Sequence, residues 1–77
     1  MESFTNDFGI TFRVGQKGVL MRNFSKNESP ETLTVVGFSP SGSVIKCQND
    51  RGFIYNVNSS NRNIRGSHMG NTYVIFE

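Results

Sequence analysis

The chain has 77 residues, of which 35% are hydrophobic, and it carries a formal net charge of +2. A chain of this length forms one domain with a thin core, because it buries only about 60% of the surface that its unfolded form exposes. The small scaffold disfavours a catalytic cleft. The chain has one Cys, Cys47, and one His, which excludes an internal disulfide and a Cys/His zinc site.

The distribution of charge is more informative than its sum. Between Gly9 and Gly70, eight basic residues stand against three acidic ones, a balance that suits nucleic acid without requiring it. No apolar run is long enough for a membrane span, and no charged-then-apolar leader for export is present. We therefore expect a cytoplasmic protein that uses no cofactor or metal.

The first third of the chain predicts an arm followed by two short strands. Residues 1–8 carry no hydrophobic period, and we expect a loose arm before a single domain over residues 9–77. Phe8–Val14 alternates apolar with polar residues and predicts a strand with one apolar face. A Gly-containing turn leads to a second strand, Val19–Phe24, and the polar Ser25–Glu31 then predicts a long loop.

The middle of the chain predicts a three-stranded antiparallel meander. Its strands are the β-branched and aromatic runs Thr32–Phe38, Ser43–Asn49 and Phe53–Asn58. Each of the two intervening turns ends in Gly, at residues 42 and 52, as expected for a type I turn followed by a left-handed residue.

Alternation along these three strands divides their side chains between two faces. We assign to the interior Leu33, Val35, Ile45, Cys47, Phe53, Tyr55 and Val57. The opposite face is unusually apolar for a surface, with Val36, Phe38, Val44 and Ile54 among its residues. Either both sides of the sheet are covered, as in a barrel of bent strands, or part of the second face meets a partner.

The last third of the chain predicts a turn and one more strand. Ser59–Asn63 has helix-capping residues but no apolar period, which predicts at most one 3₁₀ turn. Thr72–Phe76 is the last strong strand signal. Residues 66–69 read Gly-Ser-His-Met, as a cloning site leaves behind. We favour a natural loop, because the strand after it supplies apolar surface that a small core needs.

Together these elements predict an all-β fold, a small antiparallel barrel of five to six strands with a 3₁₀ turn before the last strand. Over roughly residues 10–66 the pattern resembles the SH3-like barrels, especially the Tudor and KOW-type modules. The resemblance lies in Val14–Val19, Val35–Phe38, the turn Asn49–Gly52 and the aromatic strand Phe53–Val57. It implies a module that binds nucleic acid, methylated tails or proteins of transcription and translation, and that does not catalyse.

The basic residues of the meander and of the segment after it suggest a nucleic-acid site. Cations at a hairpin tip or in a turn reach phosphates freely, amides suit phosphates or base edges, and aromatic rings stack on bases. The aromatic candidates flank the turns, and Tyr55 suits a wet site better than Phe38 or Phe53. The predicted site consists of Lys46, Arg51, Arg62, Arg65, Tyr55 and Asn49.

An alternative hypothesis is a protein-interaction module. It would use the apolar outer residues Val36, Phe38, Val44 and Ile54, or an exposed strand edge, to grip a host or transcription-related protein. The small size and Asn/Ser-rich composition suit a phage-encoded regulator of a host enzyme such as RNA polymerase. Catalysis is disfavoured, because His68 has no identifiable partner and Cys47 is expected to be buried.

Overall fold

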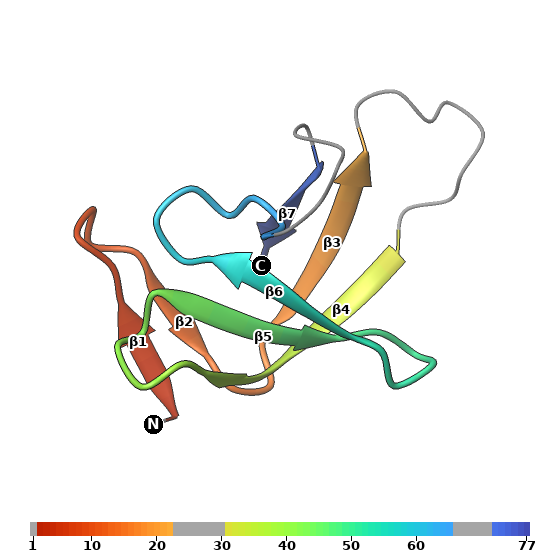
Figure 1. Cartoon of the computed structure of the whole chain (residues 1–77), viewed down its shortest axis with the longest axis horizontal. Coiled ribbons are helices and arrows are strands. Elements are labelled where there is room, and N and C mark those ends of the chain that lie inside the picture. The colour runs from red at the N-terminus through yellow and green to blue at the C-terminus, as the bar shows by residue number, and fades with distance from the viewer. Residues whose placement is uncertain (1, 23–30, 66–71) are drawn as a thin grey trace.

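The computed structural model describes residues 2–22, 31–65 and 72–77, and within them the chain forms strands and no helix. Residues 25–30 of the predicted loop Ser25–Glu31, the end of the predicted strand at Phe24 and the Gly-Ser-His-Met segment lie outside the described residues, and Glu31 instead begins a strand. The strands are β1 (Ser3–Thr5), β2 (Thr11–Arg13), β3 (Lys17–Arg22), β4 (Glu31–Phe38), β5 (Val44–Gln48), β6 (Ile54–Asn58) and β7 (Thr72–Phe76) (Figure 1).

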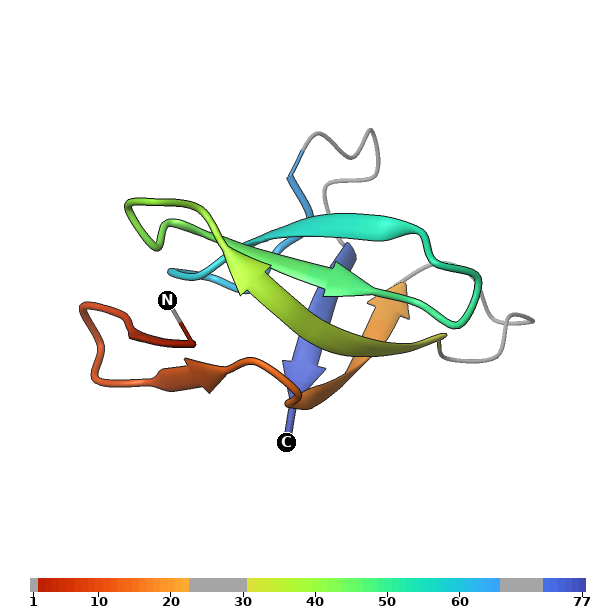
Figure 2. The same cartoon turned by 90° about the horizontal axis from the view of Figure 1, so that it is seen from below.

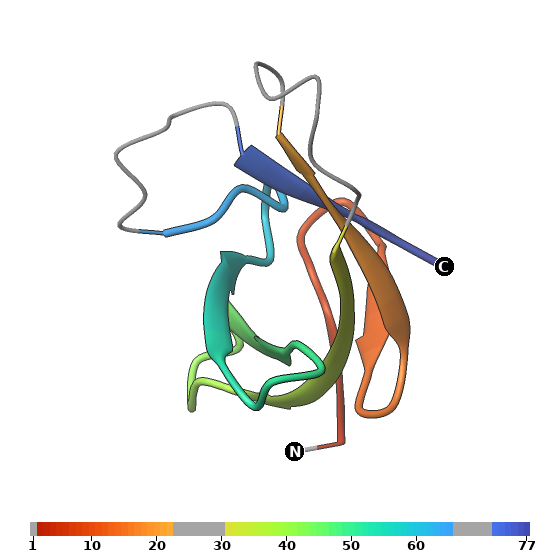
Figure 3. The ribbon, with the colours of Figure 1, turned by 90° about the vertical axis from the view of Figure 1, so that its right-hand side faces the viewer.

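Five of these strands form one antiparallel sheet in the order β6-β5-β4-β3-β7, and it curls into a half-barrel (Figure 3). Residues 62–65 connect its two edges, since Arg65 N–H donates to the Asn56 carbonyl of β6 and Val74 N–H of β7 donates to the Arg62 carbonyl. In Figure 2 the short β1–β2 ribbon lies below β4 and β5 and to the left of β3 and β7. The predicted all-β, antiparallel, barrel-like architecture is confirmed.

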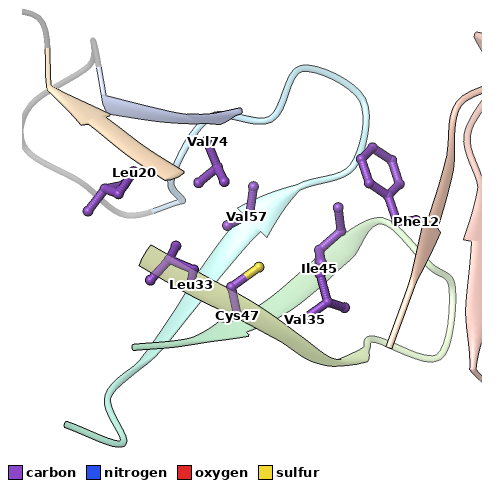
Figure 4. Close-up of a cluster of buried hydrophobic side chains, with 8 residues drawn as sticks. All are labelled: Phe12, Leu20, Leu33, Val35, Ile45, Cys47, Val57 and Val74. Atoms are coloured by element: carbon purple, nitrogen blue, oxygen red, sulfur yellow. The ribbon is translucent and has the colours of Figure 1, made fainter. Parts of the chain in front are cut away.

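The concave side of the sheet holds the core. Its buried residues are Phe12, Leu20, Leu33, Val35, Ile45, Cys47, Val57 and Val74 (Figure 4). The five of these that lie on β4, β5 and β6 were all predicted as interior from strand alternation. Tyr55, also predicted as interior, is half-buried and packs against the cluster.

The predicted outer position of Phe38 and the predicted interior position of Phe53 are both wrong, and the course of the backbone explains each. The β4–β5 register shifts between Val35 and Gly37, so Val36 is the extra residue of a β-bulge. Phe38 therefore lies opposite buried Ile45 and packs against the core, not on the outer face. Phe53 precedes β6, its N–H closes the turn, and its side chain is 59% exposed.

The two Gly-ending turns form as predicted. Gly42 N–H donates to the Ser39 carbonyl and Gly52 N–H to the Asn49 carbonyl, with φ of 78° and 86° at the two glycines. The 3₁₀ turn expected before β7 is not observed. Instead, Arg62 N–H donates to the carbonyl of Asn58, four residues earlier, and Arg62 itself has a left-handed φ of 63°.

Within the expected loose arm, residues 2–6 are held by contacts to the rest of the chain. Ser3–Thr5 forms β1 against β2, and the Phe4 ring lies 6.4 Å from that of Phe38, tilted against it. Gly42 is buried beneath Phe4, so closely that a Cβ there would meet the ring. This anchor depends on residues far apart in the sequence, which is why local pattern does not reveal it.

The turn between β1 and β2 is anchored by one buried amide. Asn6 Nδ2 donates to the Ser59 carbonyl at 2.8 Å, which ties the turn to the segment after β6. Asn6 Oδ1 accepts from Phe8 N–H and Ile10 N–H at 2.9 and 3.0 Å. All polar groups of this buried side chain are thereby satisfied, as burial requires.

We expect Gly42→Ala to destabilise the protein more than Gly52→Ala does. Both sites have positive φ, which costs an L-residue about 1–2 kcal/mol. The added Cβ would stand 2.1 Å from Phe4 ring atoms at Gly42, but 3.7 Å from its nearest neighbour at Gly52. Overpacking of this kind costs about 1–3 kcal/mol more. Urea unfolding measures the difference, and the two costs should converge in a Phe4→Ala background if the ring is its cause.

Candidate nucleic-acid interface

The outer face of β5 and β6 brings together two cations and an amide. Lys46 lies directly opposite Asn56 in the β5–β6 pairing, and residues so paired share one face of a sheet. The Asn56 carbonyl accepts the N–H of Arg65 at 2.8 Å. Ile64 bridges to buried Val57 and packs on the core, so Arg65, the next residue, is placed on the outer side. Lys46, Asn56 and Arg65 thus form one row, the Lys46 row, across three neighbouring segments.

Further amides flank this row. Asn58 lies opposite Val44 on one side of it, and Gln48 lies opposite Ile54 on the other. Asn58 N–H also donates to the Asn63 carbonyl, so Val44, Asn58 and Asn63 form a parallel row beside the Lys46 row. The face therefore offers side-chain amide donors and acceptors on both sides of the two cations.

No carboxylate occupies an outward strand position of β5 or β6, as described between residues 44 and 58. Asp50 is in the turn between the two strands, and Glu31 lies opposite Leu20 on the inner side of the sheet. The other acidic residues of the described ranges lie outside both strands: Glu2, Asp7 and Glu77. The surface around the Lys46 row is positive and rich in hydrogen-bonding groups, which are properties of a phosphate-binding surface.

The four predicted phosphate-binding cations are not all brought together. Lys46 and Arg65 share the row described above. Arg51 is exposed in the β5–β6 turn, at the opposite end of β6 from Arg62. Arg62 lines a hollow beside Phe12 and β7 instead. Arg62 thus lines that hollow while Arg65 belongs to the Lys46 row, although they are three residues apart.

Tyr55 and Asn49 have their polar groups engaged within the fold. Tyr55 Oη donates to Glu31 Oε2 at 2.9 Å, and Asn49 Nδ2 donates to Glu31 Oε1 at 2.7 Å. Asn49 Oδ1 accepts from Arg51 N–H and Phe53 N–H, both at 2.9 Å. These bonds fasten the β5–β6 hairpin to the start of β4, and they give both residues a structural role.

Phe53 is an exposed aromatic residue in the β5–β6 turn, close in sequence to Arg51. Its ring stands edge-to-face on Tyr55, with centroids 4.8 Å apart, and it follows Arg51 by two residues. The sequence suggested Phe53 as a stacking residue but assigned it to the interior. Asn49 was the sequence signal that Phe53 belongs to the turn, because an Asn side chain there can accept the Phe53 N–H, as Asn49 Oδ1 does.

The apolar outer residues of the protein-interaction hypothesis do not form one patch. Phe38 belongs to the inner side, and Val44 is only partly exposed. Val36 and Ile54 are 42% and 40% exposed, but they lie on β4 and β6 with β5 between them. Isolated apolar residues of this kind are ordinary on a protein surface.

Cys47 is fully buried, and desolvation raises the pKa of its thiol to about 12. A thiol that keeps its proton at neutral pH is a poor nucleophile and metal ligand. Within the described residues, no group of three or more His, Cys, Asp or Glu is positioned to hold a metal ion. This part of the chain also has no helix with the length and hydropathy of a membrane span.

No protein-family model matches the chain, and comparisons with curated proteins and with solved structures find no significant similarity.

Burial of Cys47 predicts a loss of stability at alkaline pH. The thiol has a pKa near 12 in the folded state and 9.0 as an ordinary thiol, so above pH 9 only the unfolded chain releases its proton. The stability that the protonated thiol provides is complete below pH 9 and falls by about 1.4 kcal/mol per pH unit above it. In urea unfolding from pH 7 to 11, the stability difference between wild type and Cys47→Ala should shrink above pH 9. A difference that stays constant would contradict this account.

Tyr55→Phe separates a structural from a binding role. Loss of the hydrogen bond to Glu31 should lower the free energy of unfolding by about 1–2 kcal/mol, since the acceptor is a carboxylate. Affinity for nucleic acid, measured by fluorescence anisotropy on the folded variant, should stay within twofold of wild type. A tenfold loss of affinity would return Tyr55 to the binding site.

Proposed function

We propose that this protein is an SH3-like barrel that binds nucleic acid and does not catalyse. The sheet order β6-β5-β4-β3-β7 supports this assignment, as do the tight turns between β4, β5 and β6 and the turn at residues 58–62 that follows β6. The binding surface is the outer face of β5 and β6, centred on the Lys46 row.

One observation carries the proposal: Lys46, Asn56 and Arg65 are brought into register, with no carboxylate on the surrounding strand positions. Three adjacent segments at about 4.8 Å spacing place the two cations about 10 Å apart. Cations on either side of an amide suit a sugar-phosphate backbone, with the amide of Asn58 beside them for base edges or sugars. The Gln48 amide already donates to the Gly52 carbonyl at 3.2 Å.

The exposed Phe53 favours single-stranded over double-stranded nucleic acid. A ring that is 59% exposed offers a stacking surface, and unpaired bases can reach such a surface whereas stacked pairs cannot. Arg51, in the turn of the same hairpin, adds a cation farther along the strands from the Lys46 row. Phosphate contact therefore extends along the hairpin toward the ring.

Removing the charges of the row should weaken binding and reduce its salt dependence. In titrations of labelled single-stranded DNA and RNA at several salt concentrations, Lys46→Gln with Arg65→Gln should lower affinity about tenfold or more. The slope of log K against log salt should fall by about 1.4, since each phosphate contact to a single strand contributes about 0.7. Arg13→Gln with Arg62→Asn removes the same charge elsewhere, and Asn tolerates the left-handed backbone at residue 62.

The control variant should keep the wild-type slope and nearly the wild-type affinity. Equal losses in both double variants would mean that only net charge matters and would refute a localised interface. Absence of any binding by wild type at low salt would refute nucleic-acid binding altogether.

A further inference from the structure

The C-terminal half of β7 has an unpaired edge. Val74 N–H donates to the Arg62 carbonyl, and Ile64 N–H donates to the Thr72 carbonyl, so the main-chain groups of even-numbered residues in β7 point away from β3. By the alternation of a strand, Phe76 N–H and C=O point the same way. In the described part of the chain nothing hydrogen-bonds to these two groups, nor to the Val74 carbonyl.

β2 presents a second edge toward this one. Val14 N–H donates to the Glu2 carbonyl and Asn6 N–H to the Ile10 carbonyl, so even-numbered residues of β2 face β1. The main-chain groups of Thr11 and Arg13 consequently face away from β1. Among the residues described, Thr11 N–H and C=O on that side have no partner.

Gln16 shows how wide the gap between the two edges is. Its side-chain Oε1 accepts Arg13 N–H of the β2 edge at 3.0 Å, and its Nε2 donates to the main-chain oxygen of Glu77 at the end of β7. One amide therefore bridges the edges as a peptide group of an intervening strand would. Beside Gln16, no described residue bridges the two edges in this way. There Thr11 of β2 and Val74 and Phe76 of β7 line a hollow of about 350 Å³.

The hollow has the lining of a peptide site. The rings of Phe12 and Phe76 meet edge-to-face with centroids 5.1 Å apart and both line it. Ile10 and Ile75 line it as well and are 37% and 53% exposed. Apolar side chains of an added strand would find contacts there at alternate positions.

Charge identifies the class of occupant. Arg62 lines the hollow, and Arg13 and Lys17 line the adjoining one, against the single carboxylate of Glu77. None of these three cations pairs with a carboxylate of the described residues. Long cations beside an open edge also discourage pairing between two copies of this chain.

We propose that the gap between β2 and β7 receives an extended acidic segment of a partner protein, which adds as a strand and completes the barrel. Its main chain pairs with Thr11 on one side and with Val74 and Phe76 on the other. Its acidic side chains meet Arg62 and Arg13. This site is separate from the Lys46 row and does not depend on nucleic-acid binding.

The probe is a display library of random eight-residue peptides, from which binders are selected and synthesised. Selected peptides should be enriched in Asp and Glu, and their binding should protect the amides of Thr11 and Phe76 from hydrogen exchange, as followed by NMR. Thr11→Pro removes the N–H that faces the gap and leaves the β1 pairing intact, and it should weaken binding at least fivefold. Thr11→Val keeps that N–H, loses the same hydroxyl, and should bind within twofold of wild type.

Several results would overturn the proposal. One is a set of selected peptides without acidic enrichment, or with equal affinity for the Thr11→Pro and Thr11→Val variants. Another is peptide binding that leaves the Phe76 amide unprotected, a readout that needs no mutation. A third is protection of both amides in the free protein at concentrations where it sediments as a dimer, because the gap would then be occupied by a second copy.

Discussion

The pairing of β4 with β5 decides which side chains of this protein meet solvent. Before the bulge at Val36, alternate residues of β4 enter the core, and after it the phase reverses, so that Phe38 is also directed inward. The extra residue bends the strand and increases its twist, which helps a five-stranded sheet to curl into a half-barrel. On the other side of β5, its pairing with β6 places Lys46 opposite Asn56 and thereby begins the outer row.

The N-terminal ribbon shows how such a short chain covers an incompletely closed barrel. Phe12 enters the core from β2, and Phe4 covers Gly42 from β1, so two aromatic rings from outside the main sheet seal its open side. Within the described residues the ribbon makes no main-chain hydrogen bond to β7. The Gln16 amide bridges the two, and the Phe12 and Phe76 rings are in contact. A small core is thus completed by side chains, while an edge of the backbone stays available.

Much of the fold follows from the sequence because alternation and turn chemistry are local. The interior residues of β5 and the glycines of both turns could be predicted from the residues immediately next to them in the sequence. The bulge was not foreseeable, because Val36 is as β-prone as the residues around it, and only pairing with β5 selects it as the extra one. The candidate site was predicted only in part, because which residues it contains also depends on how the segments pair. Lys46 and Arg65 meet through the register of three segments, and the left-handed backbone at Arg62 and its bond to β7 separate it from Arg65.

The two proposed sites lie on different walls of the barrel, which bears on whether they influence one another. Going round the barrel, β5 is separated from β7 by β4 and β3 in one direction, and by β6 and residues 62–65 in the other. Coupling between the sites would have to pass through residues 62–65, which pair with β6 and with β7, so an added strand that holds β7 in place would also steady Arg65 beside Asn56.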